Sequence, residues 1–118
     1  TLVGRDNWAK EMGFTGTLTG AGSLTYSRGR GDGRYNSNGK LIIGGDASGF
    51  TGMITMNAAN GYSTGLDMRT SMAQGGVTLT SGTDTTGFAF MRVLGDIEIA
   101  SLDGTANSQV GAVGERVR

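Results

Sequence analysis

A seven-residue motif that occurs twice decides the fold. Residues 13–19 read Gly-Phe-Thr-Gly-Thr-Leu-Thr, and residues 49–55 read Gly-Phe-Thr-Gly-Met-Ile-Thr. A third, shorter copy begins at residue 87, so that the aromatic residue recurs at Phe14, Phe50 and Phe88, which are 36 and then 38 residues apart. An internal repeat of this kind is typical of proteins that stack one structural unit on the next.

Short runs of apolar and β-branched residues surround the repeats, alternate with polar residues and end at turn-forming residues. Such alternation predicts half-buried strands. The expected strands lie at residues 23–26, 40–43, 65–68, 77–80 and 97–99. Residues 6–12 are the one place for a short helix, capped by Asp6 or Asn7 and with Trp8 facing Met12, or else an irregular lead-in.

The repeat spacing favours an all-β chain wound into a β-solenoid. If each interval covers two coils, one coil takes roughly 18–20 residues, and the three phenylalanines stack as an interior ladder. We expect a lead-in or N-terminal cap over residues 1–12 and one domain of solenoid repeats over residues 13–118. An antiparallel β-sandwich is the alternative, because short strands with frequent turns describe that fold as well.

The composition limits the chemistry that the chain can perform. The chain has 118 residues, of which 23 are Gly, and it lacks Cys, His and Pro. Without Cys and His we expect no zinc or haem site, and the sequence indicates no cofactor. No apolar run approaches the roughly 20 residues of a membrane-spanning helix, so we expect no membrane insertion of this segment.

The charges balance overall but not along the chain. Lys and Arg number 10, and so do Asp and Glu, which gives no electrostatic reason to expect a nucleic-acid partner. Residues 1–40 nevertheless carry six basic and three acidic side chains, and the remaining residues carry an excess of acid. A basic front and an acidic back are compatible with head-to-tail stacking of copies.

The repeat motif also carries a family resemblance. Joined to the following Gly-Ala-Gly-Ser-Leu-Thr at residues 20–25, it resembles the passenger repeats of autotransporter adhesins. Residues 97–104, followed by Val110-Gly111, are similar to another passenger-associated repeat. The resemblance implies a right-handed parallel β-helix that is exported to the bacterial cell surface, associated with the outer membrane, and it transfers no catalytic residue.

One loop is the candidate contact site. An Arg-Gly-Asp tripeptide at residues 30–32 has the form that integrins recognise, and nearby arginine and tyrosine side chains suit a phosphate or a glycan. An ordinary solvated turn explains the same residues. The candidate surface contact residues are Arg28, Arg30, Asp32, Arg34 and Tyr35.

No residue is assigned to catalysis or to a metal. Asp96 and Glu98 would share one strand face as an acid/base pair, but without His, Cys or a pocket signature we interpret them as exposed turn and strand charges. The acidic residues that follow residue 32 do not have the spacing of a calcium loop. Threonine pairs at residues 17 and 19 and at residues 78 and 80 resemble the outward rows of ice-binding proteins.

The sequence therefore predicts a non-catalytic structural or adhesive β-solenoid module of an extracellular bacterial surface protein. Its expected partners are further copies of itself, in head-to-tail or lateral contact, or a glycan or protein on a host or cell surface. The alternatives are a self-assembling subunit of an extracellular fibre or sheath, and then a carbohydrate-active or ice-binding β-helix.

Overall fold

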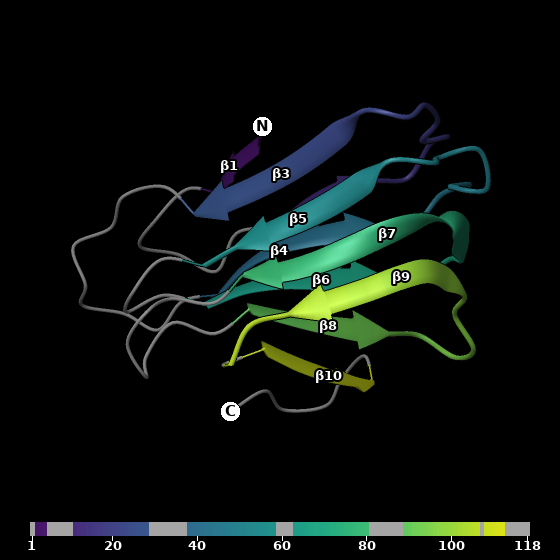
Figure 1. Ribbon diagram of the computed structural model, residues 1–118. Helices are drawn as coiled ribbons and strands as arrows, with labels where there is room; N and C mark the ends of the chain where they lie inside the picture. The colour runs from purple at the N-terminus through teal and green to yellow at the C-terminus, as the bar shows by residue number, and fades with distance from the viewer. Residues whose placement is uncertain are drawn as a thin grey trace.

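The chain forms two parallel β-sheets that face each other, as a computed structural model shows (Figure 1). The model describes residues 2–4, 11–28, 38–58, 63–80, 89–106 and 108–112, and these contain strands and no helix. The odd sheet holds β1 (Leu2–Gly4), β3 (Ser23–Arg28), β5 (Met53–Asn57), β7 (Met72–Thr80) and β9 (Ile99–Gly104). The even sheet holds β2 (Glu11–Phe14), β4 (Asn38–Ile43), β6 (Ser63–Met68), β8 (Ala89–Val93) and β10 (Ser108–Ala112).

Consecutive strands alternate between the two sheets, so one odd and one even strand make a level of the stack. The strand order is β1-β3-β5-β7-β9 in the odd sheet and β10-β8-β6-β4-β2 in the even sheet. All strand pairings in the described residues are parallel. The all-β prediction is confirmed, and the antiparallel β-sandwich is wrong.

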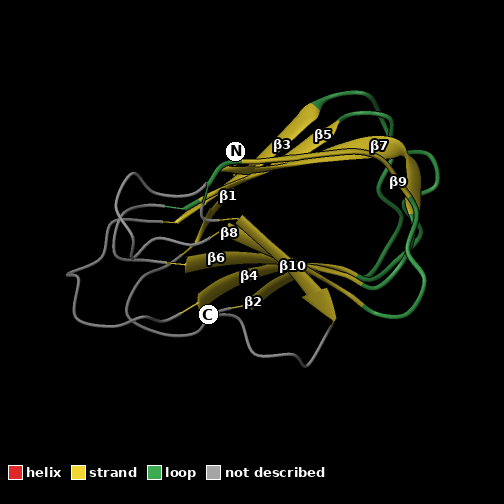
Figure 2. Ribbon diagram, turned by 60° about the horizontal axis from the view of Figure 1, so that its bottom comes forward, coloured by secondary structure: helices red, strands yellow, loops and turns green. Residues whose placement is uncertain are grey.

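The two sheets face each other (Figure 2). The core lies between them, where matching positions of successive strands form apolar rows. In the odd sheet one row is Leu24, Ile54, Val77 and Leu102. In the even sheet one row is Leu41, Leu66, Met91 and Val110, and the next is Phe14, Ile43, Met68 and Val93. Stacking apolar side chains in rows buries the apolar faces of the inner levels against their neighbours.

The predicted coil length and the predicted phenylalanine ladder are both wrong. Paired residues are 30 apart from Ser23 to Met53 and 25 apart from Thr64 to Ala89, and the shortest step is 19 residues, from Ala89 to Ser108. Phe14 ends β2, whereas Phe50 lies in a loop and bridges to Gly20. Phe88 lies outside the described residues. The interior rows consist mainly of aliphatic and Met side chains, with single aromatic residues at Phe14 and Tyr26.

The expected local elements are partly confirmed. The strands predicted at residues 23–26, 40–43, 65–68 and 77–80 all lie within β3, β4, β6 and β7. The strand predicted at residues 97–99 begins only at Ile99. Residues 6–10 of the suggested helix are outside the described part of the chain, and Glu11 and Met12 belong to β2.

Two corners between the sheets require glycine because backbones of adjacent levels approach each other there. A Cβ atom on Gly45 would overlap the carbonyl oxygen of Gly16, and one on Gly52 would overlap that of Gly22. The obstacle is backbone, which cannot rotate away as a side chain can. These close approaches explain the glycines at positions 45 and 52.

Candidate functional site

The outer face of the odd sheet is a grid of short polar side chains. Thr25, Thr55 and Thr78 face the same way in one row across β3, β5 and β7. Flanking rows add more hydroxyl and amide groups: Ser23, Ser27, Asn57, Thr80 and Ser101. Adjacent strands lie about 4.8 Å apart, so the hydroxyl groups repeat at regular intervals along the stack.

Contacts within this grid connect neighbouring levels. Thr78 Oγ1 donates a hydrogen bond of 3.3 Å to Met53 Sδ, and Asn57 Nδ2 donates one of 3.5 Å to Ser27 Oγ. The three threonines of the central row are half-buried. Thr78 belongs to one of the two threonine pairs that the sequence singled out, whereas Thr17 lies in a loop.

The outer face of the even sheet contains a buried ion pair. Asp67 on β6 is only 2% exposed, and Arg92 on β8 donates from Nε to its Oδ1 at 3.2 Å. Arg69 approaches the other carboxylate oxygen at 3.5 Å. The Arg92 guanidinium also stands 5.1 Å from the centre of the Phe90 ring, a cation–π geometry.

This pair links β6 to β8 in the even sheet and occupies both carboxylate oxygens of Asp67. Asp67 and Arg92 are register partners on adjacent parallel strands, so their attraction favours this alignment over a shifted one. Sequence reasoning did not identify either residue. The sequence did contain a signal for the ion pair. Asp67 and Arg92 each interrupt an apolar strand segment, and they lie on adjacent levels of the stack.

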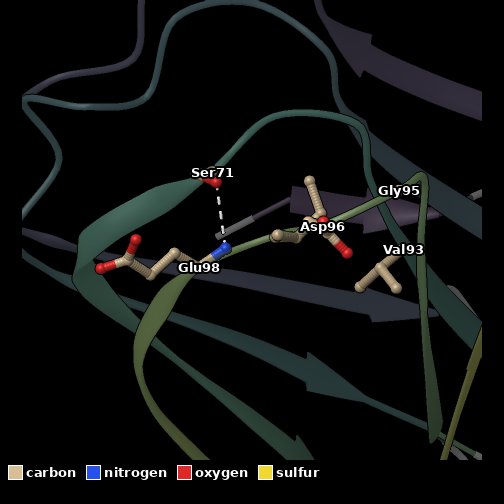
Figure 3. A pocket seen from close by; sticks show the side chains of 6 residues that line it. Ser71, Val93, Gly95, Asp96 and Glu98 are labelled. Atoms are coloured by element: carbon tan, nitrogen blue, oxygen red, sulfur yellow. Dashed lines mark hydrogen bonds between the residues drawn. The ribbon is translucent and has the colours of Figure 1, made fainter.

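A shallow depression lies at the turn between β8 and β9, lined by Ser71, Val93, Gly95, Asp96, Ile97 and Glu98 (Figure 3). The Glu98 backbone N–H donates a hydrogen bond of 2.9 Å to Ser71 Oγ. Figure 3 shows the Asp96 and Glu98 carboxylates extending away from each other. Both precede β9 and are exposed, so the predicted sharing of one strand face is wrong.

Asp46 shapes an exposed turn in the loop between β4 and β5. The Ser48 backbone N–H donates to Asp46 Oδ1 at 2.9 Å, and the Ser48 hydroxyl donates to the same oxygen at 2.7 Å. These hydrogen bonds hold the pKa of Asp46 below its usual value, because they stabilise the ionised carboxylate. The arrangement is a local turn and brings no second acidic group to the carboxylate.

The last level of the stack exposes two large apolar side chains. Leu102 on β9 is 43% exposed and Val110 on β10 is 55% exposed, although both continue rows that are buried elsewhere. These are the terminal strands of the two sheets. We call this surface, defined by β9 and β10 with Leu102 and Val110, the C-terminal end face.

The predicted contact loop lies almost entirely outside the described residues. Arg28 ends β3, while Arg30, Asp32, Arg34 and Tyr35 fall in a segment that the structure does not describe. Within the described ranges, no group of three acidic side chains could hold a metal ion, and no helix has the length and apolarity to cross a membrane.

Comparisons with protein-family models, with curated proteins and with solved structures find no match to this chain. The resemblance to autotransporter passenger repeats therefore stays a prediction.

Proposed function

We propose that the chain is a non-catalytic structural module, a segment of right-handed parallel β-helix that belongs to an extracellular bacterial surface protein. The observation that carries the proposal is the continuous register of strands across five levels in both sheets. Backbone ladders and apolar rows that run along one axis make a stiff rod. The right hand is supported by the strong preference of strand–crossover–parallel strand connections for that hand.

The location rests on the resemblance in the repeat motif together with the composition. A chain rich in Gly, Thr and Ser that stacks parallel strands suits export and folding outside the cell, and its lack of Cys makes folding independent of disulfide formation. The adhesive contact of Arg28, Arg30, Asp32, Arg34 and Tyr35 remains part of this proposal. Binding of glycans or integrins that is lost in the variant Arg30→Ala/Asp32→Ala tests it.

The non-catalytic assignment is supported by the geometry of the acidic side chains. Asp67 is occupied by two guanidinium groups, and Asp96 and Glu98 diverge around an open depression. An enzyme needs acid and base groups that converge on one substrate position. Turnover of a polysaccharide that disappears in Glu98→Gln would contradict this assignment.

The structural role is tested by imaging the purified chain. Electron microscopy should show short rods, and circular dichroism of the same sample should show β-structure with one cooperative thermal transition. A chain that lacks β-structure at all concentrations contradicts the proposal.

A second candidate function, ice binding, is favoured by one observation. Thr25, Thr55 and Thr78 align in a single outward row on a sheet, which supplies regularly spaced hydroxyl and methyl groups. Ice crystals grown in the presence of the protein should become faceted if this face binds them. The variant Thr55→Lys should abolish that effect, and unaltered disc-shaped crystals in the wild type would exclude the function.

A further inference from the structure

Met53 is the methionine that reaches the surface among those whose side chains the structure describes. It begins β5 on the outer face of the odd sheet, where it is half-buried and its register partner Ser23 is exposed. The Met12 side chain lies outside the described part of the chain. The other methionines, which we call the core methionines, are closed off from solvent: Met56, Met68 and Met72 are 0% exposed and Met91 is 4% exposed. The described side chains therefore place one thioether outside the core.

A glycine on the neighbouring strand lets this thioether lie on the sheet. Met53 and Gly76 are register partners on β5 and β7. A Cβ atom on Gly76 would lie 2.9 Å from Met53 Cε and 3.1 Å from Met53 Sδ, so the end of the Met53 side chain extends across to β7. A larger residue at position 76 would compete for the same place. The sulfur is thus positioned on the sheet surface rather than extended into solvent.

A hydroxyl group contacts one side of this sulfur. Thr78 Oγ1 donates a hydrogen bond of 3.3 Å to Met53 Sδ, and Thr78 belongs to the half-buried threonine row of the same face. A thioether sulfur carries two lone pairs and is a weak acceptor. The hydroxyl engages one lone pair, so a reagent that arrives from solvent meets the other.

We propose that Met53 is a site of reversible oxidation by peroxides, a modification that goes beyond the proposed structural role. A lone pair of Met53 Sδ attacks one oxygen atom of hydrogen peroxide, and the S–O bond forms while the O–O bond breaks. The hydroxide that leaves takes the proton from the transferred oxygen, so the products are methionine sulfoxide and water. The sulfur is oxidised and the peroxide is reduced. Methionine sulfoxide reductases reverse such a change.

Oxidation at this position changes the outer face and leaves the core intact. The sulfoxide oxygen is a stronger acceptor than the sulfur, and the Thr78 hydroxyl is beside it to donate. A sulfoxide at Met56 or Met68 would instead bury a polar oxygen among apolar side chains, which costs stability. The arrangement confines oxidation to a place that the fold tolerates, where it makes the grid of hydroxyl groups more polar.

Peptide mass spectrometry tests the proposal by measuring the oxidation rate of each methionine in the folded protein exposed to hydrogen peroxide. Met53 should oxidise about tenfold or more faster than the core methionines, because a core sulfur reacts only after local opening of the fold. The chain unfolded in denaturant is the matched control, and there these methionines should react at similar rates. A core methionine that reacts as fast as Met53 in the folded protein would overturn the proposal.

The sulfoxide epimer that forms tests the part played by Thr78. Oxygen added to one lone pair or the other gives different epimers, and each epimer is the substrate of a different reductase. Oxidised wild type, digested to peptides, should contain one epimer in excess, as read by the share that each reductase repairs. Thr78→Val keeps the shape of the side chain and removes the donor, so its epimers should be closer to equal. An equal mixture in the wild type, or an unchanged excess in Thr78→Val, would overturn the role of the hydroxyl.

Stability and repair distinguish a surface site from damage to the core. Protein oxidised only at Met53 should keep the circular dichroism spectrum and the melting temperature of the untreated protein, and the reductases should restore its original mass without unfolding it. Met53→Leu, which keeps a similar volume, should gain no oxygen under the same treatment. Loss of β-structure as Met53 oxidises, or a sulfoxide that the reductases repair only after unfolding, would overturn the placement of this site on the outer face.

Discussion

Replacing Gly65 with alanine should destabilise the fold, because the added methyl group would overlap the ring of Phe90. The two residues are register partners on β6 and β8. Phe90 is 1% exposed and the Arg92 guanidinium stands over its ring, so the ring cannot swing into solvent without losing its packing. An aromatic ring that covers a strand glycine in this way supplies the packing that glycine lacks.

The magnitude follows from two opposing effects. Overpacking a well-filled site costs about 1–3 kcal/mol, and replacing glycine by alanine in a compatible strand recovers about 0.4–1 kcal/mol through the unfolded state. We expect Gly65→Ala to lower the free energy of unfolding by about 1–2 kcal/mol. Gly13→Ala is the control on the same outer face of the even sheet. Its added Cβ would lie 3.6 Å from the Ile42 Cβ, which is an ordinary van der Waals contact.

Denaturant unfolding followed by circular dichroism measures both variants. Gly13→Ala should be neutral or stabilising by up to about 1 kcal/mol. The double variant Gly65→Ala/Phe90→Leu should recover part of the loss in Gly65→Ala, because the smaller side chain makes room for the methyl group. Equal stability of Gly65→Ala and the wild type would refute the pairing of β6 with β8 in this register.

Three further variants test individual contacts. Arg92→Met should lower the free energy of unfolding by about 3 kcal/mol, because it leaves Asp67 buried beside one weaker partner; a thermal melt that matches the wild type would contradict the buried pair. Thr64→Val should raise the free energy of unfolding by about 1 kcal/mol, because the Thr64 hydroxyl is buried without a hydrogen-bond partner. A lower free energy of unfolding in denaturant would show that the hydroxyl is needed. Ser48→Ala should raise the pKa of Asp46 in an NMR titration, because it removes one of the two donors that lower it. The ionised form of Asp46 therefore contributes stability above its unfolded pKa that is lost as the pH falls through its folded pKa, and this loss should be smaller in Ser48→Ala.

Much of the local structure was predictable from alternation alone. Residues 23–26, 65–68 and 77–80 alternate core-facing apolar residues with polar residues or glycine, and each range lies in a strand. Residues 40–43 also lie in a strand, although Ile42 breaks the alternation and only Leu41 and Ile43 are buried. Alternation has a period of two that a strand imposes on its own sequence. It says nothing about which strand lies alongside, and so it could not choose between parallel and antiparallel sheets.

The repeat was misleading because its two similar copies occupy different places in the fold. Residues 13–19 cover the end of β2 and the loop that follows, whereas residues 49–55 cover a loop and the start of β5. The spacing of 36 residues is therefore no multiple of the level spacing. The true levels vary in length because the segments between strands vary, and only the strand positions stay in register.

The candidate surfaces could be predicted only in part. A threonine pair at residues 78 and 80 pointed to the outer face of the odd sheet, but the partners Thr25 and Thr55 emerge only from the register. The C-terminal end face could not be seen in the sequence, since Leu102 and Val110 resemble any core residues. Their exposure follows from their place in the last level.

Disulfide trapping tests the in-register parallel stack most directly, and the chain suits it because it has no cysteine of its own. Thr25 and Thr55 are register partners on β3 and β5, with Cα atoms about 4.8 Å apart in a parallel ladder, within the range that a disulfide spans. Asn57 lies two residues further along β5, about 8 Å from Thr25 and beyond that range. The account predicts rapid oxidation of Thr25→Cys/Thr55→Cys and none of Thr25→Cys/Asn57→Cys, as read by mass spectrometry. Preferred bonding of the second pair would contradict it.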